Sequence, residues 1–406
     1  MSPIAPSVSH AMLVQFVVKV SKLCNLRCSY CYEYPELANP ARMSLEQIGR
    51  MFEHLAGYYR DVAPGAELRF IWHGGEPLVQ EPAYYRDIFA EQERHFGEMN
   101  VVNWVQTNLT LLDDERIDLL KHDFDGVGIS IDLFGDLRLN VAGRPSQPRV
   151  LENMARLQAV GVPHGCITVL TRKNLPHLER IFRFYESLDY SFRVLPLFHG
   201  AYEAQHLGYE VTGHEVMTAL CRLADLWLAS DTRIRIAPIT EQLGELLRSR
   251  APGFQPVYYD RRSWETVVLI NTNGDLYSQA DAYDVERSWG NIFRSPMADI
   301  LRSEARARSV LDAESRMATA CLSCGYFGAC NGFPIAEDNR RYADAIHGGR
   351  VACVVERGLF HHLERRLHEA EARFGAGIWQ RLEPLPGDAP SAPRSQLPTE
   401  AGGPPP

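Results

Sequence analysis

The sequence predicts an α/β fold in which a parallel sheet closes fully or partly as a barrel. Six short apolar segments, separated by amphipathic helices, lie between residues 12 and 198, and such alternation is typical of parallel strands joined by helical crossovers. Polar motifs follow several of these segments, at the strand ends where such sheets bind ligands. The chain of 406 residues is 45% hydrophobic, which is enough to bury a large core.

Each predicted element has a local signal. The first strand covers 12–20, and a helix follows at 44–59, where Ser44 and Gln47 form a capping box before an apolar stripe. The other predicted strands are 67–77, 100–108, 124–132, 163–171 and 190–198, and the helices between them are 83–96, 113–122, 149–161 and 175–188.

The rest of the chain divides into shorter units. Residues 201–263 are predicted as a helical spacer after a core of residues 1–200, and 264–382 as a second domain. That domain begins with a hairpin whose turn is Asn273-Gly274. It continues with helices near 297–310 and 353–374. Residues 383–406 are rich in Pro, Gly, Ser and Ala and are predicted to be disordered.

Composition excludes several classes of protein. A formal charge of −9 argues against broad contact with nucleic acid. The chain has no apolar run long enough for a membrane span and no signal peptide, so we expect a cytoplasmic protein. Nine cysteines are too few for a disulfide scaffold in a cytosolic chain of this length.

Three of the cysteines lie together in the loop after the first strand. Cys24, Cys28 and Cys31 have the spacing C-x3-C-x2-C, and Tyr32 follows directly. Three soft thiolates this close suit an iron–sulfur cluster, whereas structural zinc would need a fourth nearby ligand. A four-iron cube held by three cysteines leaves one iron free for a small ligand.

At CNLRCSYC the chain resembles the radical S-adenosylmethionine (SAM) superfamily. The resemblance implies a partial (β/α)6 radical SAM barrel whose three cysteines hold a [4Fe-4S] cluster, with the amino and carboxylate groups of SAM on the fourth iron. It further implies an enzyme that generates a 5′-deoxyadenosyl radical, which abstracts a hydrogen from the substrate.

Further motifs resemble that superfamily at three strand ends. Gly74, Gly75, Glu76 and Pro77 resemble its GGEP element, which receives the SAM ammonium group; the glycines permit close backbone approach and the carboxylate suits a cation.

Gln106 and Asn108 resemble its QTNGT element near SAM and the substrate, although Leu109 replaces the usual glycine. Ser130 and Asp132 resemble its ribose-binding strand end. Arg144 is predicted to hold the SAM carboxylate or the substrate, or else to be a solvated surface arginine.

A second cysteine group lies near the end of the chain. Cys321, Cys324 and Cys330 are followed by Cys353, and by spacing alone zinc and a [4Fe-4S] cluster compete for these four thiols. The run resembles the SPASM iron–sulfur extension of peptide-modifying radical SAM enzymes, which favours the cluster.

Two departures from the SPASM pattern are informative. Pro334 and Ser278 stand where that family has cysteines of a second auxiliary cluster. We therefore predict two [4Fe-4S] clusters in all, one that binds SAM and one auxiliary. Cys166 and Cys221 lie among apolar neighbours and are predicted to be core thiols.

The local sequence around both cysteine groups resembles that of enzymes that mature ribosomally made precursor peptides. The expected reaction is a C–C cross-link of the cyclophane type at an aromatic residue, with the auxiliary cluster accepting an electron and an external flavodoxin- or ferredoxin-type donor supplying one. The candidates for the general base are Asp132, Asp136, Glu203 and Glu241. The leader of the precursor is expected to dock on the core, on the spacer or on a separate protein.

Other functions remain open. A sulfatase-maturing enzyme, which oxidises Ser or Cys to formylglycine, shares the scaffold but normally has both auxiliary clusters. Thioether formation and epimerisation of a peptide are further reactions of the same scaffold. A non-enzymatic protein with structural or redox-sensing clusters is the alternative outside catalysis.

Overall fold

The computed structural model describes residues 13–198, 200, 207–338, 344, 346–347, 350–375 and 377–382. The predicted base Glu203 and the predicted tail 383–406 lie outside these residues. Among the described helices, none is both long and apolar enough to cross a membrane.

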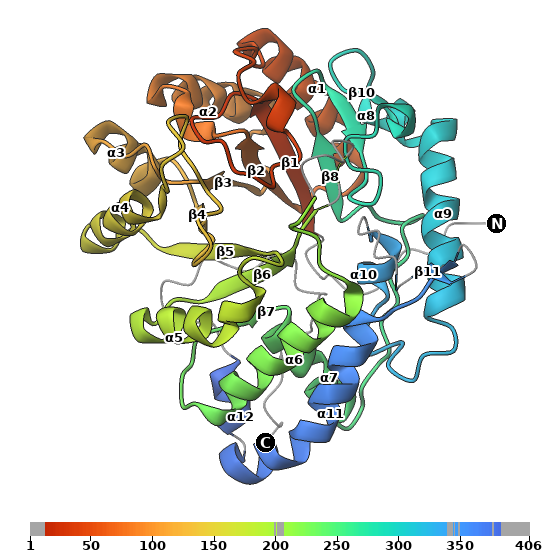
Figure 1. The fold of residues 1–406 in the computed structure, drawn as a ribbon. Helices are drawn as coiled ribbons and strands as arrows, with labels where there is room; N and C mark the ends of the chain where they lie inside the picture. Colours follow the sequence, from red (N-terminus) through yellow and green to blue (C-terminus); the bar gives the residue numbers. More distant parts are fainter. Residues whose placement is uncertain are drawn as a thin grey trace, which may run out of the picture.

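One curved ten-stranded sheet organises the molecule, with helices α1 to α5 on its outer side (Figure 1). The strand order is β10-β9-β8-β1-β2-β3-β4-β5-β6-β7. The strands are β1 (Leu13–Ser21), β2 (Glu67–Gly74), β3 (Val101–Thr107), β4 (Gly126–Ser130), β5 (His164–Leu170), β6 (Phe192–Pro196), β7 (Ile236–Ala237), β8 (Val267–Ile270), β9 (Asp275–Tyr277) and β10 (Gly290–Asn291), with a separate pair β11 (Ile346–His347) and β12 (Arg350–Val351).

Helical crossovers join the strands β1 to β6, which are all parallel to their neighbours. The predicted alternating barrel is therefore confirmed. The α-helices are α1 (Leu45–Val62), α2 (Pro82–Phe96), α3 (Asp114–His122), α4 (Gln147–Ala159), α5 (Leu178–Leu188), α6 (Gly213–Ala229), α7 (Ile239–Ser249), α8 (Met297–Leu301), α9 (Glu304–Ala320), α10 (Phe333–Ala336), α11 (Val355–Phe374) and α12 (Gly377–Arg381). Short 3-10 turns are η1 (Tyr34–Glu36), η2 (Pro77–Val79), η3 (Leu175–His177) and η5 (Val285–Arg287).

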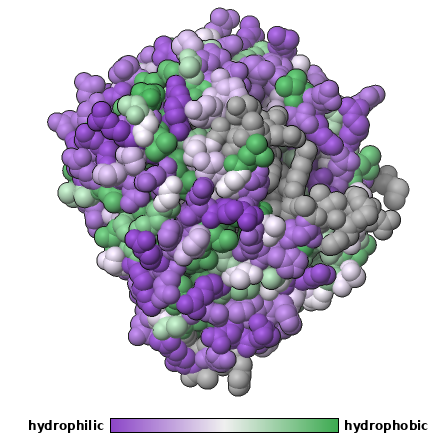
Figure 2. Space-filling model, viewed as in Figure 1, coloured by the Kyte–Doolittle hydropathy of each residue, from purple (hydrophilic) through white to green (hydrophobic). Residues whose placement is uncertain are grey.

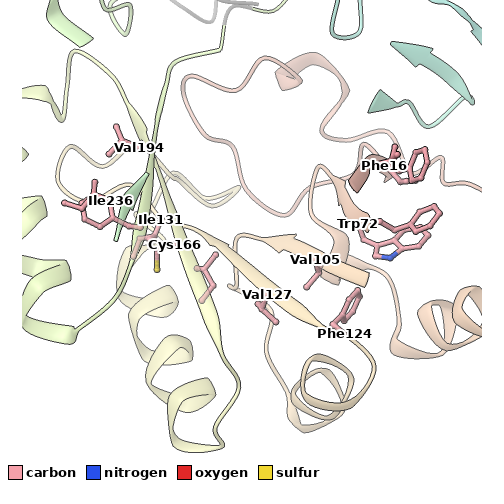
Figure 3. Close-up of a cluster of buried hydrophobic side chains, with 14 of the residues drawn as sticks. Phe16, Trp72, Val105, Phe124, Val127, Ile131, Cys166, Val194 and Ile236 are labelled. Atoms are coloured by element: carbon pink, nitrogen blue, oxygen red, sulfur yellow. The ribbon is translucent and has the colours of Figure 1, made fainter. Parts of the chain in front are cut away.

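The main core fills the space between the sheet and its helices. Figure 3 shows side chains such as Phe16, Trp72 and Val105, which come from the successive strands β1, β2 and β3. Cys166 belongs to this core and is 2% exposed, as predicted. Figure 2 shows hydrophilic residues over most of the face drawn, with hydrophobic residues in small groups between them.

The C-terminal part shares the sheet with the barrel. Strand β8 pairs in parallel with β1, and the β8–β9 hairpin turns at Asn273-Gly274 as predicted. Gly274 has a φ of +89°, a conformation that favours glycine. The N-terminal cysteine loop and the C-terminal hairpin are therefore neighbours.

Two sequence-based expectations need correction. The helix expected near 297–310 is two helices, because Ser303 caps α9 by accepting a hydrogen bond from the Arg306 backbone N–H at 3.1 Å. The predicted helical spacer also contributes the short strand β7, which extends the sheet beside β6. Two residues are too few to show an alternating pattern.

Candidate active site

The cysteine loop after β1 is fixed by neighbouring backbone. The Cys24 N–H donates to the Leu37 carbonyl at 3.0 Å, and the Arg27 and Ser29 N–H groups donate to the carbonyls of Leu139 and Leu137. Cys24 and Cys28 are 8% exposed. The surrounding cluster of buried apolar side chains consists of Leu26, Tyr30, Leu37, Leu137 and Leu197.

The donor set fits a [4Fe-4S] cluster. Burial raises the pKa of the Cys24 and Cys28 thiols to about 12, and it raises the pKa of Cys31 as well. These buried sulfurs become thiolates only beside a compensating positive charge, which iron supplies. Among the described residues, no three Cys, His, Asp or Glu side chains converge as closely as one metal ion requires, and a multi-iron cluster holds its cysteines further apart.

The glycines of the GGEP motif bring the end of β2 against the cysteine loop. A Cβ atom at Gly74 would lie 2.1 Å from the Ser21 carbonyl oxygen, and one at Gly75 would lie 2.2 Å from that of Lys22. The Gly75 N–H donates to the Ser21 carbonyl at 3.0 Å. The two glycines therefore allow β2 to approach the backbone of the cysteine loop closely.

Glu76 is a buried junction between two strand ends. One carboxylate oxygen accepts from the Leu78 N–H at 2.9 Å and the Thr107 hydroxyl at 2.6 Å. The other accepts from the Asn108 N–H at 2.7 Å. Burial raises the pKa of this carboxyl group. The carboxylate therefore joins β2 to β3, and its contact with SAM stays a prediction.

Polar side chains at the ends of β3 and β4 contact each other and the cysteine loop. The Gln106 amide donates to the Ser130 hydroxyl at 2.8 Å. The Asn108 amide donates to the Asn25 side chain at 3.0 Å, and its nitrogen lies 3.9 Å from the Cys24 sulfur. The three motifs predicted to bind SAM thus lie near the cysteines, at the C-terminal ends of the strands.

Leu109 occupies a backbone conformation that favours glycine. Its φ is +52° and its side chain is completely buried. The Leu109 N–H donates to the Thr107 hydroxyl, and the Asn153 amide donates to the Leu109 carbonyl at 2.8 Å. These two bonds hold a conformation that is strained for leucine, which explains why glycine is usual at this position of the motif.

Asp132 lies in a buried ion pair. One carboxylate oxygen accepts from the Arg138 guanidinium at 2.7 Å and from the Tyr30 hydroxyl, and the other accepts from the Val169 N–H at 2.7 Å. The Asp132 carboxylate raises the pKa of Arg138. With both oxygens engaged, Asp132 is poorly placed as a base, and its ribose-binding role stays a prediction.

Arg138 is a site residue that the sequence analysis missed. It sits in the loop after β4 that covers the cysteines, and its side chain is 14% exposed. Arg144, the predicted residue in the same loop, is exposed. The hydrophobic neighbours Leu137 and Leu139 are the signal that would have distinguished Arg138.

The two other base candidates among the described residues belong to different elements. Asp136 is exposed in the loop after β4, with a φ of +48°. Glu241, on α7, pairs with Arg193 at 2.9 Å.

The second cysteine group forms one pocket. Cys321, Cys324, Cys330 and Cys353 all line it, together with apolar side chains that include Phe327, Ile335 and Phe360. Burial raises the pKa of Cys321 to about 11 and that of Cys330 to about 12. Four thiols around a common cavity in an apolar shell fit an auxiliary [4Fe-4S] cluster.

Ser278 stands where a cysteine is expected, and its side chain is hydrogen-bonded. It is completely buried, and its hydroxyl donates to Asp281 at 2.9 Å while accepting from the Asp281 N–H at 3.0 Å. Pro334 lies in α10 and lines the pocket of the four cysteines. These two positions therefore provide no thiolate.

The barrel carries three cysteines, a GGEP turn and polar side chains together at the C-terminal ends of its strands. This combination is typical of enzymes that bind SAM at an iron–sulfur cluster. Residues 18–185 match the sequence model described as the Radical SAM superfamily. The chain thus contains a radical SAM domain over these residues, and its motifs are those of an enzyme that depends on a [4Fe-4S] cluster and SAM.

Several known proteins are similar over most of the chain. A serine-type anaerobic sulfatase-maturating enzyme of Bacteroides thetaiotaomicron is 25% identical over 374 residues, which are 86% of this chain and 89% of that protein. A cysteine-type anaerobic sulfatase-maturating enzyme of Clostridium novyi is 23% identical, covering 78% and 86%.

Solved structures show the same fold. The structure of anSMEcpe with bound AdoMet has a TM-score of 0.66 at 16% identity, covering 88% of this chain and 99% of that one. SuiB of Streptococcus suis bound to S-adenosylmethionine has a TM-score of 0.54 at 16% identity, covering 79% and 72%. The predicted resemblance to SPASM-type enzymes is supported, whereas none of these proteins is described as cyclophane-forming.

Proposed function

We propose that this enzyme oxidises a side chain of a peptide or protein substrate. The observation that carries the proposal is similarity to a serine-type sulfatase-maturating enzyme along nearly the whole of both chains. Structures of the same fold hold peptides: anSMEcpe was solved with the Cp18Cys peptide and SuiB with the precursor peptide SuiA.

The site residues suit a radical reaction. When bound, the cluster and SAM would supply radical chemistry that removes a hydrogen atom from the substrate. The leucines around the cysteine loop exclude water from the reacting groups. Gln106 and Ser130, hydrogen-bonded to each other, offer amide and hydroxyl groups at the strand edge for the polar parts of SAM.

Among side-chain oxidations, the relatives favour formylglycine formation over the cross-link expected from the sequence. Cross-linking remains the second candidate because of one observation. Ser278 and Pro334 remove two thiols that the SPASM resemblance assigns to a second auxiliary cluster, so the chain departs from the sulfatase-maturing pattern. An external one-electron donor of the flavodoxin or ferredoxin type completes the proposal.

Mass spectrometry separates these reactions. The reconstituted enzyme, SAM and a reductant are incubated with a peptide that contains one Ser and one Trp, and with its Ser→Cys and Ser→Ala counterparts. Formylglycine formation removes two hydrogens from the Ser peptide, gives a carbonyl that reacts with a hydrazide, and spares the Ala peptide. A cross-link also removes two hydrogens but gives no hydrazide adduct.

The other outcomes exclude the proposal. Solvent deuterium uptake without another mass change would indicate epimerisation instead of net oxidation. If SAM were consumed without 5′-deoxyadenosine, radical chemistry itself would be refuted. The control is the Cys28→Ser variant, which lacks one ligand of the SAM-binding cluster and should form neither product.

A further inference from the structure

Lys19 is a completely buried cation at the C-terminal end of β1. Its relative exposure is 0%, and its register partner on β2 is His73. Burial lowers the pKa of Lys19 to about 8. A buried ammonium group is costly unless specific partners neutralise it, so its partners indicate what it holds in place.

The partners of Lys19 come from two distant parts of the sequence. Its Nζ atom pairs with Glu33, and it lies 4.7 Å from the centre of the Tyr32 ring. Both residues directly follow the cluster ligand Cys31. On the other side Nζ lies 3.1 Å from the centre of the Tyr283 ring, which belongs to the loop after β9.

The loop that carries Tyr283 is itself held firmly. Tyr283 has a φ of +61°, an uncommon conformation that persists only when neighbours fix it. Two residues earlier, Asp281 accepts hydrogen bonds from Ser278, Ser309 and Arg287. The ring of Tyr283 is thus placed by its own loop and meets Lys19 as a fixed surface.

We propose that Lys19 is a positioning residue whose cation ties Tyr32, Glu33 and therefore Cys31 to the 278–283 loop. The C-terminal region then helps to fix the geometry of the SAM-binding cysteine loop. This coupling goes beyond the proposed function, because it holds whichever bond the enzyme makes or breaks.

Hydrogen–deuterium exchange of the full chain without its clusters tests the coupling directly. The relevant amides are those of Cys31, Tyr34 and Glu36, which are hydrogen-bonded within the loop. Tyr283→Leu should speed their exchange about tenfold, because the desolvated cation–π contact with Lys19 and the ring stacking on Tyr32 are both lost. Tyr283→Phe should leave the exchange near wild type. The matched control is Tyr258→Leu, which removes an exposed tyrosine that packs on Phe327.

A second readout uses the reconstituted, reduced enzyme. The change that SAM produces in the electron paramagnetic resonance spectrum reports on the cluster at Cys31. The double variant Lys19→Met, Glu33→Gln removes both charges together and should alter this spectral change. The Lys19→Arg variant keeps the cation, so its spectral change should stay near that of wild type.

Three results would overturn the proposal. One is wild-type exchange and spectra in Tyr283→Leu, and another is wild-type behaviour of the double variant. The third result applies if Tyr283→Leu unfolds the sheet. In that case pentafluorophenylalanine is placed at position 283, which keeps the size of the ring but removes its negative face. Exchange equal to that of Tyr283→Phe would then refute the cation–π contact.

Discussion

At the scale of single residues, the site depends on buried charges whose partners all come from the chain. Asp132 and Arg138 form such a pair above the cysteine loop, and Tyr30 adds a third member. Removing one member of a buried pair leaves the other charge uncompensated, which costs more than the pair contributes. This pair therefore helps to hold the loop over the cysteines in place.

Replacing Arg138 tests this role. Arg138→Met should lower the free energy of unfolding by about 3 kcal/mol, because the Asp132 carboxylate stays buried without its cation. Urea denaturation of the cluster-free chain measures the change. Arg144→Met is the control, since Arg144 is exposed in the same loop, and its effect should stay within about 0.5 kcal/mol. Equal effects of the two variants would contradict the structural role of the pair.

A second residue-scale prediction concerns Glu337, a buried carboxyl group near Arg261. Burial raises its pKa from 4.5 to about 7. The folded chain therefore binds this proton more tightly than the unfolded chain, so stability is present below about pH 4.5 and is lost as the pH rises through 7.

Glu337→Gln removes that titration. The free energy of unfolding of the variant, relative to wild type, should rise by about 2 kcal/mol between pH 5 and pH 7.5. Urea denaturation at several pH values measures it. A Glu314→Gln variant is the control, because Glu314 is a surface partner of Arg262. A difference between Glu337→Gln and wild type that stays constant with pH would contradict the raised pKa.

At the scale of elements, the end of β2 and the cysteine loop are built as one unit. Gly75 has no room for a Cβ atom, because the Lys22 carbonyl oxygen would lie 2.2 Å away. A change of side-chain rotamer cannot relieve this clash, because the clashing atom belongs to the backbone. A larger residue must therefore displace the loop that carries Cys24.

Gly75→Ala should thus remove the SAM-binding cluster while leaving the barrel folded. Iron per chain should fall by about half, and far-ultraviolet circular dichroism should stay unchanged. Gly57→Ala is the matched control: nothing lies within 4 Å of its added Cβ on α1, and alanine in a helix stabilises by about 0.5–1 kcal/mol. A full iron content in Gly75→Ala would contradict the packing argument.

At the scale of the whole molecule, seven cysteines form two groups, and we predict that each group holds one cluster. Iron analysis of the reconstituted enzyme should give about eight irons per chain. Cys28→Ser and Cys353→Ser should each retain about four, and Cys166→Ser should retain all eight because Cys166 lies in the core. About twelve irons in the wild type would show that Ser278 and Pro334 do not mark a missing cluster.

Much of this architecture was predictable because it depends on local pattern. Alternating apolar segments predicted the order of β1 to β6, and cysteine spacing predicted that Cys321, Cys324, Cys330 and Cys353 come together. Contacts between distant segments carry no such pattern. Lys19 inside an apolar strand and the two-residue strand β7 are defined by partners far away in sequence. The same limit applied to Asp132, whose ion pair becomes visible only once the loop is folded.

The pairing of β8 with β1 has a consequence for how the enzyme is made. The first strand and its cysteines leave the ribosome early, but their neighbouring strand follows only after roughly another 250 residues. At 5–20 residues per second, that interval is on the order of ten to fifty seconds. During this time one edge of β1 lacks its native neighbour, and strand edges of that kind invite aggregation. Iron–sulfur assembly at Cys24, Cys28 and Cys31 should therefore be a late event in biogenesis, following synthesis of the hairpin that completes the sheet.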